Sequence, residues 1–307
     1  MKHSSQESCK CILVADLHGN IAQYNALRQI VIKENVSFVF FAGDLLPKDG
    51  GLWYLGNAVR TIQAQRTFLE SFLIGYLREL GKHARIYAIF GNDDFRSNYD
   101  LVQNVSDKVH FLNKEVVRLP LRNQELYVAG YPQVALTPFL QKDWEQWDDV
   151  IGAIPHKTYK VEGYDSYHGV HHPISFKDNA DGRPTIATDL VKLVLESDPK
   201  KTLYLMHDVP FNTPLDQIAT DNPFIKDGGV HVGSRAIRAF IEAEQPLLTM
   251  HGHIHETLRE SGAFRWDCGN SVSIAPSHDY KGGVLSYVMF DLPNLNTIAR
   301  YTQDSSE

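Results

Sequence analysis

Side chains that can bind metal ions recur along this 307-residue chain, and each group directly follows a short apolar run. The groups are Asp16-Leu-His18, Gly43-Asp44, Gly91-Asn92-Asp93-Asp94, His207-Asp208 and His251-Gly-His253-Ile-His255. Imidazoles and carboxylates without a thiolate form a ligand set that suits Mn, Fe or Zn better than Mg or Ca. Ions held by such side chains lower the pKa of bound water and stabilise developing negative charge.

Taken singly, most of these groups have an ordinary structural explanation. Asp16 and His18 could form a helix N-cap region, Gly43-Asp44 could be a turn, and His207 could be a buried histidine with satisfied hydrogen bonds. The run from His251 to His255 is less easily explained, because alternating histidines in a short turn project toward one side and imidazole is the commonest transition-metal ligand. The occurrence of five groups at five strand ends favours one shared site.

The elements that must position these groups alternate between strand and helix patterns. Apolar runs predict strands at residues 11–15, 36–42, 85–90, 126–130, 202–206 and 247–250. Apolar positions three or four residues apart predict helices at 20–34, 55–80, 185–196 and 234–244. This alternation is typical of an α/β protein with helices covering a sheet, and groups at the carboxyl ends of its strands would converge.

Two regions depart from the alternation. Strands at 264–268, 272–275, 284–292 and 297–301 follow one another without helices, which predicts an antiparallel or mixed sheet. Residues 133 to about 184 are rich in Trp, Tyr, His, Asp and Gly and have poor periodicity, so we expect an inserted lid or arm there with one short helix near 139–150. The whole chain, 1–307, is then a single domain that carries this insertion.

The composition of the chain argues against nucleic acid and membranes as partners. The net charge of -7, from 37 acidic and 30 basic residues, argues against an extended contact with a nucleic-acid backbone. The N-terminal stretch lacks a signal-peptide core and no run is long enough to cross a membrane, so we expect a cytoplasmic protein without membrane contact. Three cysteines, Cys9, Cys11 and Cys268, lack the spacing of a disulfide framework or a zinc site.

The ordered motifs DLH, GD, GND, a lone His and GHIH resemble those of the calcineurin-like metallophosphoesterases, whose pattern is D-x-H, G-D, G-N-H-[DE], His and G-H-x-H. The resemblance runs from Asp16 to His255. It implies an α/β four-layer sandwich of two mixed β-sheets flanked by helices. It also implies a metal-dependent phosphoric ester hydrolase, acting on a phosphomonoester or phosphodiester through a hydroxide that bridges two metal ions.

The resemblance assigns the ligands of the two divalent or trivalent ions, which would be Mn, Fe or Zn. One ion would be held by Asp16, His18, Asp44 and His255, and the other by Asp44, Asn92, His207 and His253. Asp44 is then the bridge. Two divalent ions, two carboxylates and one hydroxide leave about one positive charge, which suits a phosphate oxygen. His251 matches no metal position and is a candidate to orient a ligand.

Asp93 occupies the position where many family members have a histidine that assists the leaving group. Asp93 could be an acid whose pKa is raised, or a histidine of the inserted segment, such as His168, His171 or His172, could replace it. The substrate could also need no acid, which we prefer and which predicts activity on aryl or nucleotide-type leaving groups. Asp94 matches the acidic end of the motif and is expected to bond nearby backbone or a ligand histidine.

Contacts to the substrate are less defined by the sequence. Arg96, just past the GND motif, could reach a phosphate, and the amide of Asn20 could approach the site. The expected partner is a small phosphorylated substrate, with nucleotide-like compounds among the candidates, and homo-oligomers are compatible with the sequence. The alternative is a scaffold that keeps the fold but binds a partner protein without turnover, although all seven ligand positions hold competent residues.

Overall fold

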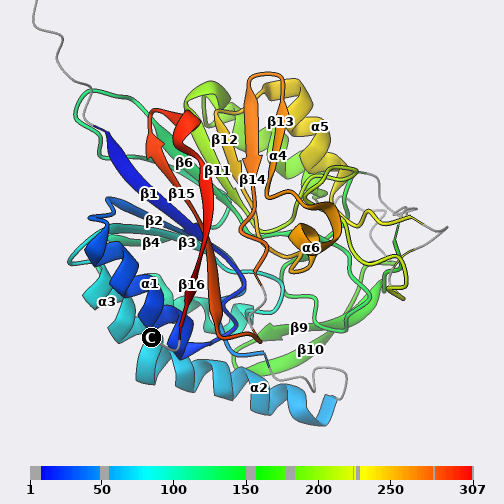
Figure 1. Cartoon of the computed structure of the whole chain (residues 1–307). Helices are drawn as coiled ribbons and strands as arrows, with labels where there is room; N and C mark the ends of the chain where they lie inside the picture. The colour runs from blue at the N-terminus through cyan, green and yellow to red at the C-terminus, as the bar shows by residue number, and fades with distance from the viewer. Residues whose placement is uncertain are drawn as a thin grey trace, which may run out of the picture.

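The computed structural model describes residues 8–48, 55–149, 157–177, 184–223, 225, 229–278 and 281–305, with the backbone alone for 55–60. Its framework is a pair of six-stranded mixed sheets flanked by helices (Figure 1), which confirms the predicted fold class. The first sheet has the order β16-β15-β1-β2-β3-β4 and the second the order β13-β14-β12-β11-β6-β5.

The first sheet is parallel from β1 to β4 and antiparallel at its other edge, where β15 pairs with β1 and β16 with β15. Its strands are β1 (Cys9–Val14), β2 (Phe38–Ala42), β3 (Arg85–Ile89), β4 (Val109–Phe111), β15 (Val284–Leu292) and β16 (Ala299–Asp304).

The second sheet has a parallel centre, β6, β11, β12 and β14, with antiparallel edges β5 and β13. Its strands are β5 (Glu115–Arg118), β6 (Tyr127–Tyr131), β11 (Thr202–Met206), β12 (Leu248–Met250), β13 (Arg265–Cys268) and β14 (Ser271–Ile274).

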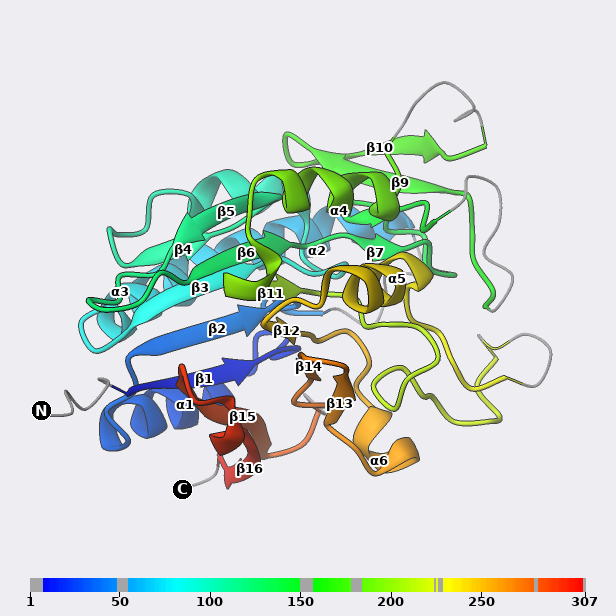
Figure 2. The same cartoon turned by 90° about the horizontal axis from the view of Figure 1, so that it is seen from above.

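Helices cover the outer face of each sheet, and Figure 2 shows the resulting layers from above. On the first sheet lie α1 (Ile21–Lys33) and α2 (Leu55–Phe68), the latter continuing through a π-helical turn, Leu69–Leu73, into α3 (Ile74–Leu80). On the second sheet lie α4 (Ile186–Leu195) and α5 (Arg235–Glu244). The four predicted helices are therefore confirmed, within a residue or two at each end.

Strand β1 shows why this sequence supports four layers. Ile12 and Val14 pack under α1 and α3, whereas Cys11 and Leu13 face the second sheet. Successive side chains of a strand point to opposite faces, so a wholly apolar strand is buried on both. The core between the sheets includes Leu203 of β11 and joins the two sheets directly.

The helix predicted near 139–150 is wrong over its described part, 139–149. Lys142, Trp144 and Glu145 are all buried, which the single inward face of a short surface helix would not allow. The backbone is extended instead, and β7 (Val134–Ala135) pairs in parallel with β8 (Glu145–Gln146). Tertiary contacts therefore override the helical pattern.

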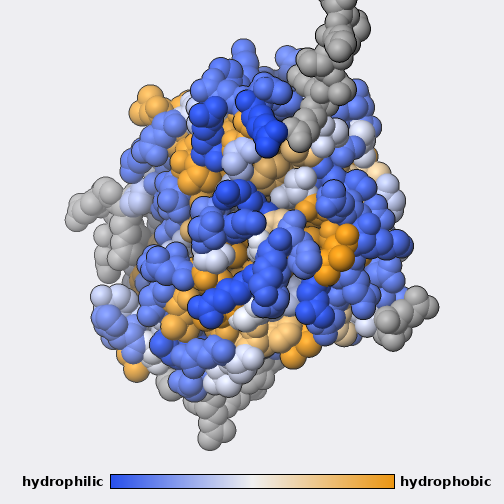
Figure 3. Space-filling view, turned by 90° about the vertical axis from the view of Figure 1, so that its left-hand side faces the viewer, coloured by the Kyte–Doolittle hydropathy of each residue, from blue (hydrophilic) through white to orange (hydrophobic). Residues whose placement is uncertain are grey.

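The remaining elements are short. They are a hairpin of β9 (Glu162–Tyr167) and β10 (Val170–Ser175), 3-10 turns at Arg96–Val102, Pro199–Lys201 and Leu295–Thr297, and α6 (Thr257–Ser261). On the face shown in Figure 3, hydrophilic residues separate small hydrophobic patches. None of the helices in the described ranges has the length and apolar character needed to cross a lipid bilayer.

Candidate metal centre

The loops that follow β1, β2, β11 and β12 are joined to one another by backbone hydrogen bonds. Asp16 N–H donates to the Gly43 carbonyl at 3.0 Å, and His18 N–H donates to the Asp44 carbonyl at 2.9 Å. In the second sheet, Gly252 N–H donates to the His207 carbonyl at 3.1 Å. With the contacts between the ligands themselves, these bonds hold the carboxyl ends of strands from both sheets at one place, where ligands collect in open α/β sheets.

Four of the predicted ligands form a tight cluster. The ligand atoms of Asp16, His18, Asp44 and His255 all lie within 4.8 Å of one another. His18 Nε2 lies 3.3 Å from His255 Nε2 and 3.6 Å from Asp44 Oδ2. Asp16 Oδ2 is buried and has no hydrogen-bond partner among the described residues. A buried acceptor beside two imidazoles fits a cation.

The other predicted ligands continue from Asp44. His207 Nε2 lies 3.4 Å from Asp44 Oδ2 and 3.0 Å from Asn92 Oδ1. The ring of His253 lies beside that of His207, with centroids 5.1 Å apart. His207 Nδ1 bonds the Ala42 carbonyl at 2.7 Å, which leaves Nε2 directed at the cluster. The structure thus brings all seven predicted ligands together, with Asp44 in contact with both groups.

Unusual backbone conformations aim these side chains. Asp16, His18, Asp44 and His253 have φ angles of 58°, 42°, 54° and 70°. Residues other than glycine rarely adopt this region, and such conformations concentrate at functional sites.

Two glycines leave room for the cluster. A Cβ at Gly91 would collide with Asp44 Oδ1 and His207 Nε2, and one at Gly43 would collide with His207 Nδ1. Gly43 also has a φ of 93°, which favours glycine. Glycine is therefore required in the GD and GND motifs by the close approach of the ligands themselves.

The histidines of the cluster mostly favour the neutral form that binds metal. Burial lowers the pKa of His18 and His253 far below the usual value and lowers that of His255 to about 3. His207 differs: burial opposes its charged form, but the carboxylate of Asp44 raises its pKa to about 10. A cation at this position would replace that proton, since ligation requires the neutral imidazole.

The carboxylates respond in opposite directions. Burial raises the pKa of Asp16 to about 7, against the charge of His207. Burial also acts to raise the pKa of Asp44, but the charge of His207 and its hydrogen bond overcome this and hold the pKa well below its usual range. Asp44 is therefore the negative centre of the cluster.

The two acidic residues of FGNDDF have different surroundings. Asp94 is fully buried and accepts hydrogen bonds from the backbone N–H groups of Gly91, Leu45 and Leu46 at 2.9, 3.2 and 2.8 Å. It ties the loop after β3 to the loop after β2. Asp93 forms an ion pair with Lys48 and accepts a 3.3 Å hydrogen bond from Asn92 Nδ2. Burial raises the pKa of Asp93, and the charge of Lys48 opposes this shift.

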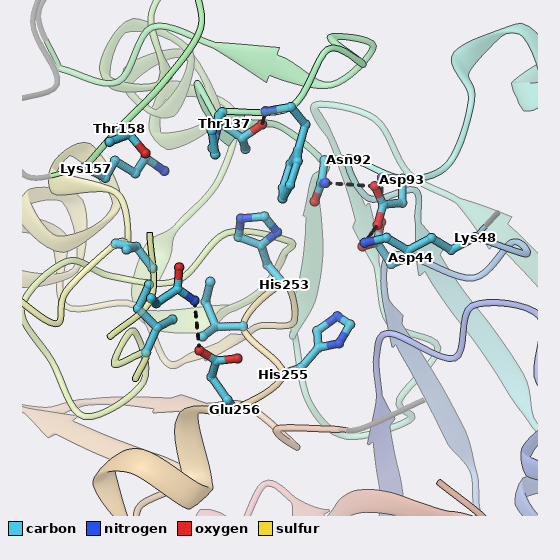
Figure 4. Close-up of a pocket in the computed structure, with 16 residues that line it drawn as sticks. Asp44, Lys48, Asn92, Asp93, Thr137, Lys157, Thr158, His253, His255 and Glu256 are labelled. Atoms are coloured by element: carbon cyan, nitrogen blue, oxygen red, sulfur yellow. Dashed lines mark hydrogen bonds and ion pairs between the residues drawn. The ribbon is translucent and has the colours of Figure 1, made fainter. Parts of the chain in front are cut away.

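A pocket of about 220 Å³ opens over the cluster (Figure 4). Asp44, Asn92, His253 and His255 line it together with Asp93. Its other lining residues include two cations, Lys48 and Lys157, the hydroxyl-bearing Thr137 and Thr158, the ring of Phe139, and Asn222 with Glu256.

Three candidates lie outside the lining of this pocket. Asn20 caps α1, its Oδ1 accepting from Gln23 N–H at 3.3 Å. Arg96 pairs with Asp165 Oδ2 at 3.3 Å and lies over the ring of Trp144. His251 is fully buried behind the ligands, with Nδ1 bonded to the Asp208 carbonyl at 2.6 Å and Nε2 to Thr249 Oγ1 at 2.7 Å.

The histidines considered as replacement acids belong to the β9–β10 hairpin, beside α2 (Figure 1). The ring of His171 packs edge-on against that of Phe95, with centroids 5.2 Å apart, and the ring of His168 lies tilted beside that of Tyr167 at the hairpin turn. None of the three histidines is part of the pocket lining in the described ranges.

Neither lysine of the pocket is among the residues predicted from the sequence. Lys48 lies four residues after Asp44, so its distance from a motif could have identified it. Lys157 belongs to a segment without periodicity, and no local pattern marks it.

Comparison with known proteins agrees with the fold and identifies the family. A sequence model of the calcineurin-like phosphoesterases matches residues 10–257. The chain belongs to the calcineurin-like phosphoesterase family. No curated protein is significantly similar to it in sequence.

Two solved structures show the same fold at low identity. TT1561 of Thermus thermophilus aligns with a TM-score of 0.56 at 13% identity, over 97% of this chain and 100% of that protein. A second structure aligns with a TM-score of 0.58 at 12% identity, over 97% and 99% of the two chains. An archaeal phosphodiesterase aligns more loosely, with a TM-score of 0.43 at 10% identity, over 96% and 99%.

Proposed function

We propose that this protein is a dinuclear metal-dependent phosphoesterase that hydrolyses a phosphomonoester or a phosphodiester. The position of Asp44 carries the proposal. Its Oδ2 lies 3.6 Å from His18 Nε2 and 3.4 Å from His207 Nε2. A carboxylate oxygen between two histidine groups is placed to be shared by two cations.

The donor set fits two such ions of Mn, Fe or Zn. Asp16, His18, Asp44 and His255 would hold one, and Asp44, Asn92, His207 and His253 the other. When bound, the ions would act as Lewis acids on the phosphoryl oxygens and lower the pKa of the attacking water. His251 would act as a positioning residue, because its two hydrogen bonds fix the Asp208 carbonyl and β12 behind the ligands.

The residues of the pocket favour a mechanism without a general acid. Asp93, the acidic side chain that follows Asn92 in the pocket lining, is paired with Lys48. Bound cations next to this pair would further favour the ionised carboxylate. Asp93 also accepts from Asn92 Nδ2, which turns the Asn92 carbonyl oxygen toward His207. We therefore assign Asp93 a positioning role and expect a substrate with a good leaving group, such as an aryl or nucleotide-type ester.

A single-domain organisation is also part of the proposal. The core between the sheets contains residues of β1, β2 and β3 together with residues of β6, β11 and β12. The segment at about 133–184 would be an insertion that builds one wall of the pocket, since Thr137, Phe139 and Lys157 belong to it.

The proposal is tested by turnover after metal exchange. Metal-stripped protein receives Mn, and hydrolysis of bis(p-nitrophenyl) phosphate is compared with that of p-nitrophenyl phosphate. We expect Mn-dependent release of nitrophenol from at least one ester. We also expect Asp44→Ala to lower the rate at least about 1,000-fold, because both ions lose a ligand. The control Asp107→Ala removes a carboxylate outside the pocket lining and should retain the wild-type rate. Bound metal without turnover of either ester would contradict the proposal.

A further inference from the structure

Lys157 is a buried ammonium group in the pocket wall that the proposed reaction does not use. Only 4% of the residue is exposed, and it lines the same pocket as Asn92 and His253. Among the residues that the structure describes, its Nζ makes one long hydrogen bond, 3.5 Å, to the Ala135 carbonyl. An ammonium has three donors, and burying it with one weak partner is costly unless an anion completes the site.

The carboxylates near Lys157 do not supply the anion that would bind its ammonium group. The charge of Lys157 acts to lower the pKa of Asp208 and of Asp148. Neither carboxylate forms an ion pair with Lys157 within the described ranges. Asp208 instead accepts from the N–H groups of Ala135 and Val209. Asp148 similarly caps α5, accepting from Arg235 N–H at 2.8 Å. Both carboxylates therefore reduce the electrostatic cost of the buried charge, but within the described ranges neither bonds Lys157 Nζ directly.

The position of Lys157 points to the far part of a ligand. In Figure 4, Lys157 and Thr158 lie on one side of the pocket, Lys48 and Asp93 lie on the other, and His253 lies between them. The wall next to Lys157 is fixed, because Lys142 Nζ donates to the Thr137 carbonyl at 2.9 Å and Thr137 N–H donates to Glu145 at 2.8 Å. A molecule with one anionic group at the metal ligands would extend toward Lys157.

We infer that Lys157 binds a second phosphate of the substrate, so that the substrate class is a phosphate ester bearing another phosphate group. This inference rests on the proposed function and narrows it. A lysine acts as a point charge that suits phosphate, and charge-assisted hydrogen bonds are about twice as strong as neutral ones. A substrate whose remainder is neutral would leave the Lys157 ammonium without a directly bonded anion in this part of the pocket wall.

Equilibrium binding tests the inference without turnover. Titration calorimetry on the Mn-loaded protein compares thymidine 3′,5′-bisphosphate with thymidine 5′-monophosphate, both as phosphonate analogues that the proposed reaction cannot hydrolyse. We expect the wild-type protein to bind the bisphosphate at least about tenfold more tightly. Lys157→Gln and Lys157→Met should both reduce this ratio toward one, and circular dichroism checks their folding. The control Lys160→Gln, which removes an exposed lysine three residues away, should keep the ratio. A wild-type ratio near one, or a ratio that survives in either Lys157 variant, overturns the inference.

Turnover separates this inference from the proposed function. The nitrophenyl ester of thymidine 5′-phosphate is compared with the same ester carrying a 3′-phosphate. A binding preference without hydrolysis of either ester, or of p-nitrophenyl phosphate, would support the role of Lys157 and contradict the phosphoesterase proposal. Equal kcat/KM for both esters, together with a binding ratio near one, would leave the enzyme in place and refute the role of Lys157.

Discussion

Asp93 differs from its neighbour Asp94 although both are buried aspartates in one turn. The carboxylate of Asp94 accepts hydrogen bonds from three backbone N–H groups and stabilises the loops that contain them. Asp93 has a cation, Lys48, and an amide, Asn92 Nδ2. An amide can direct either its oxygen or its nitrogen at a site, and only the oxygen can ligate a metal. At the residue scale, we therefore expect Asp93 to act on the metal centre through the orientation of Asn92.

Replacing Asp93 separates this positioning role from that of an acid. In Asp93→Asn, with excess Mn, we expect kcat for bis(p-nitrophenyl) phosphate to stay within about threefold of wild type, because nitrophenolate needs no proton to depart. The Mn concentration for half-maximal activity should rise by about tenfold, as for loss of a group that orients a ligand. Steady-state rates across a Mn titration measure both.

The control is Asp165→Asn, which removes the partner of Arg96 outside the pocket lining. It should leave both quantities unchanged. A fall of about 100-fold or more in kcat for Asp93→Asn, at saturating Mn, would instead identify Asp93 as a general acid.

At the scale of elements, one carboxyl connects the β9–β10 hairpin to the body. Asp143 Oδ1 accepts from Arg96 N–H, at the start of the 3-10 turn, at 2.7 Å and from Ser166 N–H of β9 at 3.2 Å. The Ser166 hydroxyl also donates to it. Its other oxygen, Oδ2, is buried without a partner among the described residues. Burial raises the pKa of Asp143 to about 7.

This raised pKa makes stability depend on pH in a defined direction. Between its unfolded value of about 4 and its folded value of about 7, the folded protein holds a proton that the unfolded chain releases. The contribution of Asp143 to the unfolding free energy is therefore present at low pH and lost as the pH rises, by up to about 4 kcal/mol. In Asp143→Asn this loss should disappear.

Urea unfolding of metal-free protein at pH 5 and pH 7.5 measures the difference. Other groups titrate in both proteins, so the change in wild type minus the change in Asp143→Asn isolates this carboxyl. Asp107→Asn, which removes a carboxylate outside this network, should behave as wild type. Equal pH dependence in wild type and Asp143→Asn would show that Asp143 is ionised when folded.

The same region shows where sequence reasoning reaches its limit. The strands before Asp16, Asp44 and Asn92 are apolar runs buried on both faces, so a local pattern predicts them and the residues that end them. The segment around Asp143 and Trp144 has no such pattern, because its hydrogen bonds go to residues about 50 positions away in the chain, such as Asp94. Helical spacing of its apolar residues therefore predicts a helix that tertiary contacts exclude.

The residues of the candidate site also differ in whether a local sequence pattern predicts them. All seven candidate metal ligands could be identified, because each belongs to a short motif at a strand end. Lys157 could not, since its place in the pocket depends on how the segment that carries it packs beside β7. Sequence periodicity also does not predict the buried charges in that wall of the pocket. Lys142 and Glu145 are both buried, and they bond each other and the backbone of Thr137.

At the scale of the whole molecule, the candidate metal centre joins the two halves of the fold. Asp16, His18, Asp44 and Asn92 follow strands of the first sheet, whereas His207, His253 and His255 follow strands of the second. Bound ions would therefore link the sheets at one end of the core that they share. Without ions, the cluster holds buried histidines and carboxylates close together, which costs free energy.

Metal removal should therefore lower the stability of the whole chain. Ions that bind only the folded state add about 2.7 kcal/mol for each site at 100 times its Kd. With about 2 °C per kcal/mol for a chain of this size, two sites correspond to a rise in Tm of roughly 10 °C. Calorimetric scans of metal-stripped protein with increasing Mn measure this rise, and elemental analysis of the same samples should give two ions per chain. Asp44→Ala should lose most of the rise because Asp44 contributes to both ligand sets, whereas Asp107→Ala should keep it. Two bound ions with an unchanged Tm would mean that the ions bind the unfolded chain as tightly as the folded one, which would contradict a site that only the folded chain forms.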